Sequence, residues 1–213
     1  MAAVAAVLLA APASAQARRP SAAPEPVPRV ALRPFFLLSG EDFFAGHTFD
    51  AAFGRSVMSL WGGGIELALR NGLYVDVTAS RFTREGERAF FFGGQGFGLG
   101  IPLTVTLTPL ELTVGGRMRL ARRTFAYAGG GLGSYSYTET SEGGDPDGDF
   151  SRRHTGYLVV GGVEHRPTRW LGLSGDLQMT RVPGILGEGG ISKEAGEDNL
   201  GGVALRFRVI LGR

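Results

Sequence analysis

Cysteine is absent from the 213-residue chain and lysine occurs once, whereas arginine occurs 21 times. The absence of cysteine excludes disulfides, iron–sulfur clusters and thiolate zinc sites. Charged residues make up only 20% of the chain, below the ~25% typical of soluble proteins. The net charge is only +2 and the basic residues are scattered, so nucleic acid is not an expected partner. Hydrophobic residues, at 43%, are too many for a disordered chain.

The first fifteen residues, MAAVAAVLLAAPASA, form a short apolar run that ends in an Ala-x-Ala cleavage pattern. We predict a signal peptide over residues 1–15. Residues 16–29 hold four prolines, which predicts a Pro-rich periplasmic tether with no core to bury. Beyond this point no run of about 18 uncharged apolar residues occurs, so we expect no transmembrane helix.

From Val30 onward, apolar and polar residues alternate with a period of two, which is typical of β-strands that separate two media. In the segment WGGGIELALR, Ile65 and Leu67 share one face while Glu66 and Arg70 share the other. An Asn-Gly turn follows directly, as expected of a hairpin.

The faces opposite the apolar ones carry small residues and single charges of both signs, rather than the dense Lys and Glu of a sheet that faces water. These faces hold five acids and six arginines, which would neutralise one another inside a narrow lumen. Such a balance is needed because unpaired buried charge is costly. The predicted lumen ion-pair network consists of Arg33, Glu66, Arg70, Asp76, Glu111, Arg117, Arg119, Glu164, Asp176, Arg206 and Arg208.

The number of strands follows from the requirement that a bacterial single-chain barrel has an even number. Nine alternating runs occur, and joining the two runs on either side of Pro109 gives eight. We expect a bulge or break near Pro109, where the apolar residues change parity. Short and long connections then alternate strictly, as periplasmic turns and external loops do, and residues 83–96 are one of the expected long loops. The sequence thus predicts an all-β fold, an eight-stranded antiparallel up-and-down transmembrane β-barrel over residues 30–213. A ten-stranded barrel with a strand near residues 49–53 is the alternative.

One strand carries a family resemblance. The segment TFAYAGGGLGSYSY is similar to the PYxGxGxGY strand of OmpW-like proteins, and LELTVGGRMRL and GYLVVGGVEHRPTRWLGLSGDLQ resemble its flanking hairpins. The region 30–213 therefore resembles the small outer-membrane β-barrels of Gram-negative bacteria, the OmpA/OmpW-like class. There are two departures: the segment Phe125-Ala126-Tyr127 has no proline where the family has a proline–tyrosine pair, and the last strand does not end on an aromatic residue, Phe207 being the nearest one.

The resemblance implies export by a cleaved N-terminal signal peptide to the cell outer membrane. It implies outer-membrane lipid, lipopolysaccharide and the outer-membrane assembly machinery as partners. Small hydrophobic ligands would be further partners if the protein works as OmpW-like proteins do, through a candidate hydrophobic mouth. The residues of this candidate mouth are Phe43, Phe44, Phe49, Phe90, Phe91 and Phe92. An aromatic girdle at the membrane interface is the competing interpretation of these residues.

Two further constellations have simple explanations. His154 near Ser151 could serve lipid acyl transfer, but no serine stands two residues from a histidine on one strand face, which favours a solvated rim histidine. Asp145, Asp147 and Asp149 could bind Ca²⁺, but their spacing departs from an EF-hand and fits a flexible acidic loop. We predict no catalytic residue, no metal site and no cofactor.

The function predicted from the sequence is a non-enzymatic structural or envelope role in the outer membrane. One alternative is an OmpW-like, porin-like binder or conduit for small hydrophobic molecules. The other is an outer-membrane lipid-modifying enzyme. A lumen of eight strands is just filled by side chains, so free diffusion through it is not expected.

Overall fold

The computed structural model describes residues 30–69, 71–92, 95–141, 150–187 and 190–212. The predicted signal peptide (1–15), the predicted tether (16–29) and Arg70 lie outside the described residues. Among the described residues, no helix has the length and hydropathy needed to cross a membrane.

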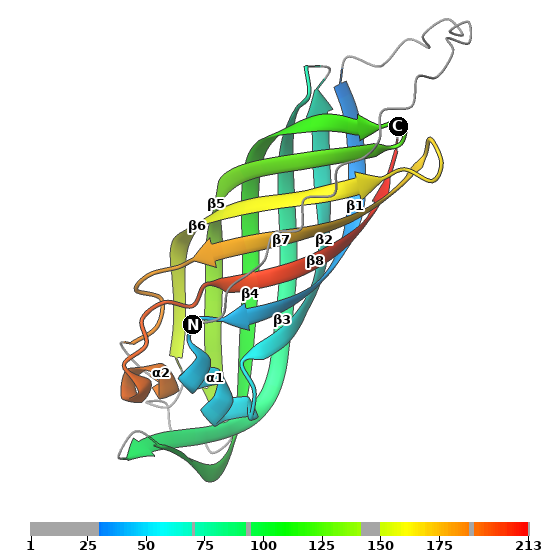
Figure 1. The fold of residues 1–213 in the computed structure, drawn as a ribbon. Coiled ribbons are helices and arrows are strands. Elements are labelled where there is room, and N and C mark those ends of the chain that lie inside the picture. The colour runs from blue at the N-terminus through cyan, green and yellow to red at the C-terminus, as the bar shows by residue number, and fades with distance from the viewer. Residues whose placement is uncertain (1–29, 70, 93–94, 142–149, 188–189, 213) are drawn as a thin grey trace, which may run out of the picture.

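Eight antiparallel strands form a closed ring in chain order (Figure 1). The strands are β1 (Val30–Phe43), β2 (Val57–Leu69), β3 (Leu73–Phe92), β4 (Gln95–Ala121), β5 (Thr124–Ser141), β6 (Phe150–His165), β7 (Leu171–Arg181) and β8 (Gly202–Leu211). The predicted eight-stranded up-and-down barrel is confirmed. The ten-stranded alternative is wrong, because the segment near residues 49–53 belongs to helix α1 (Gly46–Phe53).

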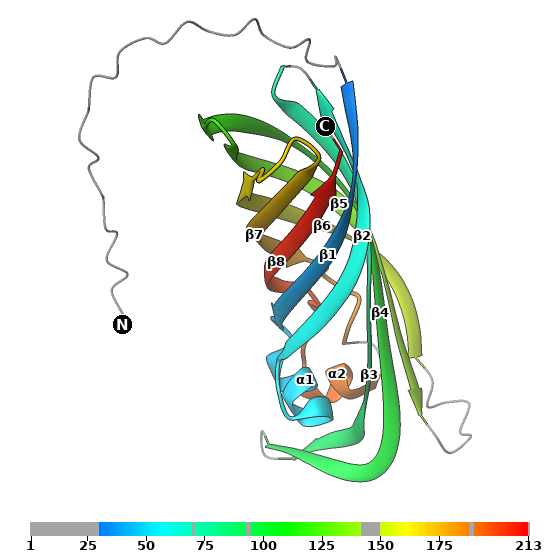
Figure 2. The same ribbon diagram turned by 90° about the vertical axis from the view of Figure 1, so that its right-hand side faces the viewer.

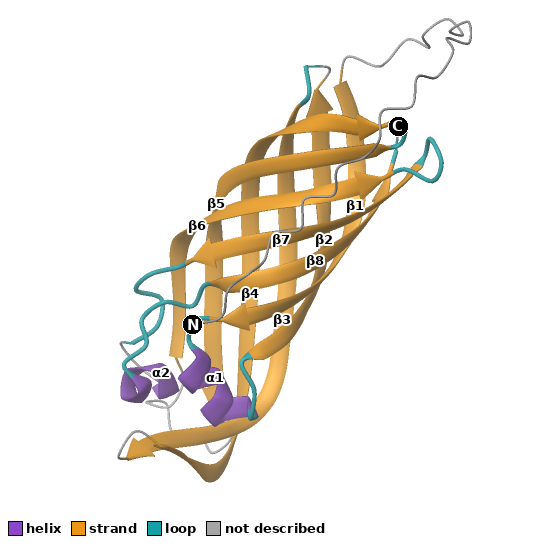
Figure 3. Ribbon diagram, viewed as in Figure 1, coloured by secondary structure: helices purple, strands orange, loops and turns teal. Residues whose placement is uncertain are grey.

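The two ends of the barrel differ in their connections. At one end, which we call the turn end, β2 is joined to β3 through Asn71 and Gly72, whose φ of +84° suits glycine. Arg122 and Arg123 alone join β4 to β5 at the same end. Helices α1 and α2 (Gly190–Ala195) lie at the opposite end, which we call the helical end (Figures 2 and 3).

The link between β3 and β4 differs from its predicted form. The sequence suggested a long loop over residues 83–96, but β3 continues to Phe92 and β4 begins at Gln95. These two strands therefore extend past the ring as a long hairpin at the helical end (Figure 2). Thr83, Glu85 and Glu87 are exposed at alternate positions of β3, and this polar pattern resembles that of a loop.

A continuous band of exposed apolar side chains surrounds the barrel, and we call it the apolar belt. All eight strands contribute to it, with Leu32, Phe36, Leu38, Trp61, Ile65, Leu67, Val77, Leu110, Leu112, Val114, Leu132, Val159, Val163, Leu173, Leu177, Leu205, Phe207 and Val209. Residues on the opposite, inward faces are buried, so the sequence alternation maps onto outside and inside.

Pro109 marks no bulge, contrary to our expectation. Strand β4 pairs with β5 in unbroken register through Pro109 and Tyr135, and the register shifts on β4 and β3 lie elsewhere, at Arg119/Ala121 and Glu87/Ala89. The apolar residues change parity because the surroundings change. On one side of Pro109 the apolar residues of β4 point outward, and on the other they point into the barrel.

The helical end of the barrel is filled by its own connections. Helix α1 packs against β3 and β4, and Phe49 stacks on Phe43 with ring centroids 4.4 Å apart. We call the resulting cluster the apolar plug. Its buried members are Phe43, Ala45, Phe49, Ala52, Met58, Leu60, Phe82, Ala89, Leu103, Val105, Leu107, Tyr135, Tyr137, Val182, Ile185, Leu186 and Leu200.

Candidate functional site

Charged side chains from opposite walls meet inside the barrel near the turn end. Arg33 on β1 donates to Glu66 on β2, with Nη1 2.6 Å from Oε1, and reaches Glu164 on β6 with its other terminal nitrogen. Arg117 on β4 bridges the same two acids at 3.0 Å and 2.5 Å. Arg166 donates from Nε to Glu164 at 2.7 Å. Glu164 thus accepts hydrogen bonds from three guanidinium groups.

A second group of charges lies next to the first along the barrel axis. Arg208 on β8 binds Asp76 on β3 at 2.7 Å and approaches Asp176 on β7 at 3.3 Å. Arg206 binds the same Asp176 at 2.6 Å, and the Tyr127 hydroxyl donates to it at 2.6 Å. Asp76 and Asp176 are both almost inaccessible, at 4% and 2% exposure.

Glu111 contacts the apolar plug through Tyr135. It accepts hydrogen bonds from the Tyr135 hydroxyl at 2.7 Å and from the Gln178 amide at 2.9 Å. Arg206 lies 3.7 Å away and also donates to Gln178. Glu111 thus lies between a cation and two neutral donors, with Thr180 extending the chain of polar contacts from Gln178.

These contacts form one layer of polar side chains across the lumen, which we call the ion-pair plug. Its members are Arg33, Glu66, Asp76, Glu111, Arg117, Glu164, Asp176, Arg206 and Arg208. The period-two alternation puts each of them on the inward face of its strand, where partners from other strands are within reach. Because every charge in the layer has an opposite partner, burial does not leave an isolated ion.

One described residue of the predicted network is not in this layer. Arg119 is exposed at the turn end, where its guanidinium lies 5.4 Å from the centroid of the Phe125 ring. Arg70 falls outside the described residues. The position of Arg119 does not contradict the alternation, because this residue stands where the lumen opens at the turn end.

Several residues that contact the layer were not predicted from the sequence. Arg166 lies in the link after β6 and was not assigned to a strand face. Tyr127, Tyr135 and Gln178 complete the hydrogen bonds of the acids. The shared parity of the aromatic residues in TFAYAGGGLGSYSY was the available signal, because it places both tyrosines on the inward face with the charges.

The phenylalanines of the candidate mouth have separate positions. Phe43 and Phe49 are buried in the apolar plug, at 4% and 1% exposure, so they close the helical end instead of lining an opening. Phe44 is 43% exposed. Phe90, Phe91 and Phe92 belong to β3, but their side chains lie outside the described part of the chain.

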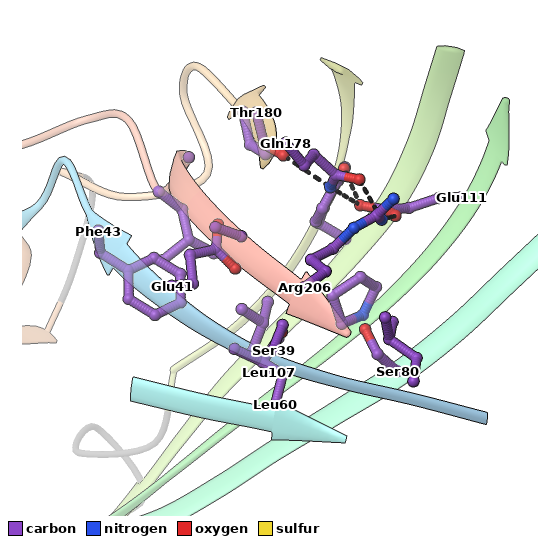
Figure 4. A pocket seen from close by; sticks show the side chains of 17 residues that line it. Ser39, Glu41, Phe43, Leu60, Ser80, Leu107, Glu111, Gln178, Thr180 and Arg206 are labelled. Carbon is purple, nitrogen blue, oxygen red and sulfur yellow. Dashed lines mark hydrogen bonds and ion pairs between the residues drawn. The ribbon is translucent and has the colours of Figure 1, made fainter. Parts of the chain in front are cut away.

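A small cavity lies where the two plugs meet (Figure 4). Ser39 and Glu41 of β1 line it together with Arg206, and Leu60 and Leu107 close its apolar side. It offers about 20 Å³ to the centres of water-sized molecules, which is room for about one water. The interior is therefore filled at this level.

A wide, shallow depression also lies on the outer wall. It lies on the apolar belt between β3 and β6, is lined by Val77, Leu110, Leu112 and Leu132, and measures about 450 Å³. Its lining is apolar, so an acyl chain fits its chemistry better than a polar solute.

Tyr137 lies in the apolar plug, beyond the belt. Its hydroxyl donates to Glu139 at 2.6 Å, and burial together with the nearby carboxylate raises the pKa of Tyr137 well above its usual value. The hydroxyl therefore stays protonated at all ordinary pH values.

The histidine–serine pair considered for acyl transfer does not form. His154 points inward on β6 and pairs in register with Tyr135, whereas Ser151 is exposed and its hydroxyl lies 3.1 Å from that of Thr138. Asp145, Asp147 and Asp149 lie outside the described residues. Within the described ranges, no group of three His, Cys, Asp or Glu side chains could hold a metal ion.

Known proteins match this chain in structure but not in sequence. Neither the protein-family models nor the curated proteins gave a match. Neisserial surface protein A is similar in structure, with a TM-score of 0.51, 12% identity, and coverage of 85% of this chain and 96% of that one. A major outer membrane protein from Thermus thermophilus has a TM-score of 0.50 and 15% identity, covering 85% and 99%.

The likeness spans nearly the whole of both solved barrels, so it shows that this chain has the fold of a small outer-membrane β-barrel. The resemblance found in the sequence is confirmed at this level. Sequence identity this low shows the fold alone, so the role of this chain is argued below from its own residues.

Proposed function

We propose that this chain is an integral outer-membrane protein whose sealed barrel has a structural, non-enzymatic role in the envelope. The small outer-membrane barrel fold supports this location. The turn end would face the periplasm and the helical end the exterior, as is usual for barrels with short periplasmic turns and long external loops.

The lack of charged residues in the apolar belt is the main support for this proposal. Arg81 and Arg181 stand at its edge toward the helical end and His165 at its edge toward the turn end. Between these edges, no outward position of the described strands carries Asp, Glu, Lys or Arg. Leu177 and Leu205, both exposed, pair across β7 and β8 in the middle of the belt. A water-facing wall of this size would expose an apolar surface far above the few hundred Å² usual for soluble proteins.

The filled interior supports a structural role over transport. A solute would have to pass both the apolar plug and the ion-pair plug, and the cavity between them holds about one water. Moving through would require Glu111 and Arg206 to lose their partners. Hydrated solutes therefore do not cross the barrel in this conformation.

Binding of small hydrophobic molecules is a second candidate, favoured by the apolar lining of the helical end. Leu103, Val105 and Leu107 point into the barrel there. In the present conformation this space is occupied by Phe49 and the residues around α2. An apolar ligand would have to displace this packing or bind at its surface beside Phe44.

Cell fractionation and conductance test the proposal together. We expect the protein in outer-membrane fractions, and we expect it to migrate faster on gels when the sample is not boiled. The mature protein should begin at residue 16 if the predicted signal peptide is cleaved. In planar bilayers it should give no steady single-channel steps. A periplasmic soluble form would overturn the membrane assignment, and regular conductance steps would overturn the sealed barrel in favour of a conduit.

The enzymatic alternative is tested separately. Expression of the chain should leave the mass of lipid A unchanged. A mass change that disappears in His154→Ala would show lipid-modifying activity and contradict the non-enzymatic role.

A further inference from the structure

The turn end of the barrel is strongly basic. Arg122 and Arg123 form the turn between β4 and β5, and Arg166 and Arg169 lie in the link between β6 and β7. The two connections are held together, because the Arg166 amide donates to the Arg123 carbonyl at 2.8 Å and the Arg123 guanidinium donates to the Pro167 carbonyl at 2.8 Å. The arginines are thus gathered on a rigid surface.

Among the residues that the structure describes, no exposed acid balances these arginines. The acids of the described residues at the turn end are Glu66 and Glu164, which are 4% and 1% exposed and already bound in the ion-pair plug. The exposed acids of the described residues lie toward the helical end and include Asp42, Asp50, Glu85, Glu87 and Asp198. The barrel therefore carries a one-sided positive charge at its turn end.

The geometry around Phe125 concentrates this charge. The guanidiniums of Arg117, Arg119 and Arg166 lie 5.0, 5.4 and 5.0 Å from the centroid of this one ring. Arg117 and Arg166 bind Glu164, whereas Arg119 is exposed and has no acidic partner among the described residues. The ring holds the three cations together despite their mutual repulsion, because its face attracts cations.

The basic surface adjoins the edge of the apolar belt. The Arg169 guanidinium lies 5.6 Å from the Trp170 ring, and Trp170 is 55% exposed. Leu120 and Leu211, 56% and 54% exposed, are the last outward apolar residues of β4 and β8 at the turn end. Tryptophan beside arginine at the end of an apolar band is the arrangement expected at the level of lipid headgroups.

We propose that the turn-end arginines bind the phosphodiester headgroups of anionic phospholipids in the periplasmic leaflet. A guanidinium fits a phosphate oxygen pair with two parallel hydrogen bonds, and Arg122, Arg119 and Arg169 have guanidiniums with no acidic partner among the described residues. The anionic cell-wall polymer is the competing partner. Lipid is favoured because the arginines border exposed apolar side chains, which a polar polymer would leave uncovered. This inference rests on the proposed outer-membrane location.

Trp170 provides a local probe. The chain has two tryptophans, so Trp61→Phe leaves Trp170 as the single one, at the proposed site. The full chain would be inserted into vesicles that contain brominated phosphatidylglycerol or brominated phosphatidylcholine at equal mole fraction. Quenching of Trp170 by the two lipids gives their relative affinity. We expect phosphatidylglycerol to be preferred by about fivefold, the contribution of roughly one arginine near an anionic headgroup. High salt should reduce this preference.

The test variant is Arg119→Gln/Arg122→Gln/Arg169→Gln, which should bring the ratio close to one. A control of equal charge change, Arg55→Gln/Arg84→Gln/Arg181→Gln, alters exposed arginines toward the helical end and should leave the ratio unchanged.

The outcomes of these measurements distinguish the lipid site from the competing explanations. Equal quenching by both lipids in the inserted parent protein would overturn the lipid site and leave the proposed function intact. Loss of preference in the control as well would overturn the assignment to the turn end. Arginine-dependent sedimentation with purified cell-wall sacculi, without lipid preference, would transfer the surface to the polymer. Failure to insert into vesicles at all would overturn the proposed function itself.

Discussion

Arg208 on β8 donates across the lumen to Asp76 on β3, with Nη1 2.7 Å from Oδ2. These strands are not neighbours in the ring, since β1 and β2 lie between them. The contact therefore joins parts of the wall that backbone pairing leaves unconnected. Arg33 on β1 makes the same kind of contact with Glu164 on β6. The ion-pair plug thus both fills the lumen and braces the ring.

Removing one acid from this layer should destabilise the barrel strongly. In Glu164→Gln, the guanidiniums of Arg33, Arg117 and Arg166 lose their shared anion while staying in place. Breaking a buried ion pair from one side costs about 3–5 kcal/mol, because the remaining charge is uncompensated. Urea unfolding in lipid vesicles would measure this loss.

Glu85→Gln is the matched control for this prediction. Glu85 is exposed on the outward face of β3, so the same change should alter the free energy of unfolding by less than about 0.5 kcal/mol. Equal losses in the two variants would mean that the ion-pair plug does not stabilise the fold.

The number of strands and the charged residues on their inward faces could be predicted from the sequence, because the alternation of apolar and polar residues depends on whether each face meets lipid or the lumen. The same principle explains the error at Pro109. The inward face of β4 carries the polar residues Glu111 and Thr113 on one side of Pro109 and the apolar residues Leu107 and Val105 on the other. This change of polarity on one face resembles the change of parity that a bulge produces. The backbone of β4 continues without a bulge, but the surroundings of its two faces change. The outward face becomes polar where the wall leaves the apolar belt, and the inward face becomes apolar where it meets the apolar plug. Periodicity alone cannot detect such a change, because it identifies a face only where that face meets the same surroundings along the whole strand.

The partners of the charges were less predictable than the charges. Parity places Glu164 inside the barrel, but only the closed ring brings Arg33, from the other end of the chain, to it. Arg166 was missed because it lies in a link without alternation. The helix at residues 46–53 was also missed, since its packing against β3 and β4 holds it in place and the segment is too short to be helical alone.

The apolar plug predicts a sharp difference between two phenylalanines. Phe49→Ala should cost about 3–5 kcal/mol, because the ring is 1% exposed and leaves a cavity against Phe43 and Phe82. Phe44→Ala should cost much less, because that ring is 43% exposed. Unfolding titrations in vesicles would measure both. If both changes leave stability unaltered but abolish binding of an apolar ligand, the helical end is an open mouth and the plug is an incorrect description.

The buried tyrosine of the plug predicts a loss of stability at high pH. Because the pKa of Tyr137 is raised in the folded protein, the folded state keeps a proton that the unfolded state releases above pH about 10. Its contribution is complete below that pH and decreases as the pH rises, by up to about 1.4 kcal/mol per pH unit. Unfolding measured from pH 9 upward should show this slope, and Tyr137→Phe should reduce it by one proton. An unchanged slope in the variant would show that this hydroxyl is ionised in the folded protein.

The orientation of the wall can be tested by placing arginine at two depths of β7 and β8. Leu177 lies midway along the belt and Leu211 at its end, and both are more than half exposed. In a bilayer, Leu177→Arg should cost about 2–4 kcal/mol and Leu211→Arg no more than about 1 kcal/mol, because the penalty decreases toward the headgroups. Unfolding in vesicles of a single lipid would give both values. In water the two substitutions would cost about the same, so equal losses would mean that the apolar belt does not face lipid.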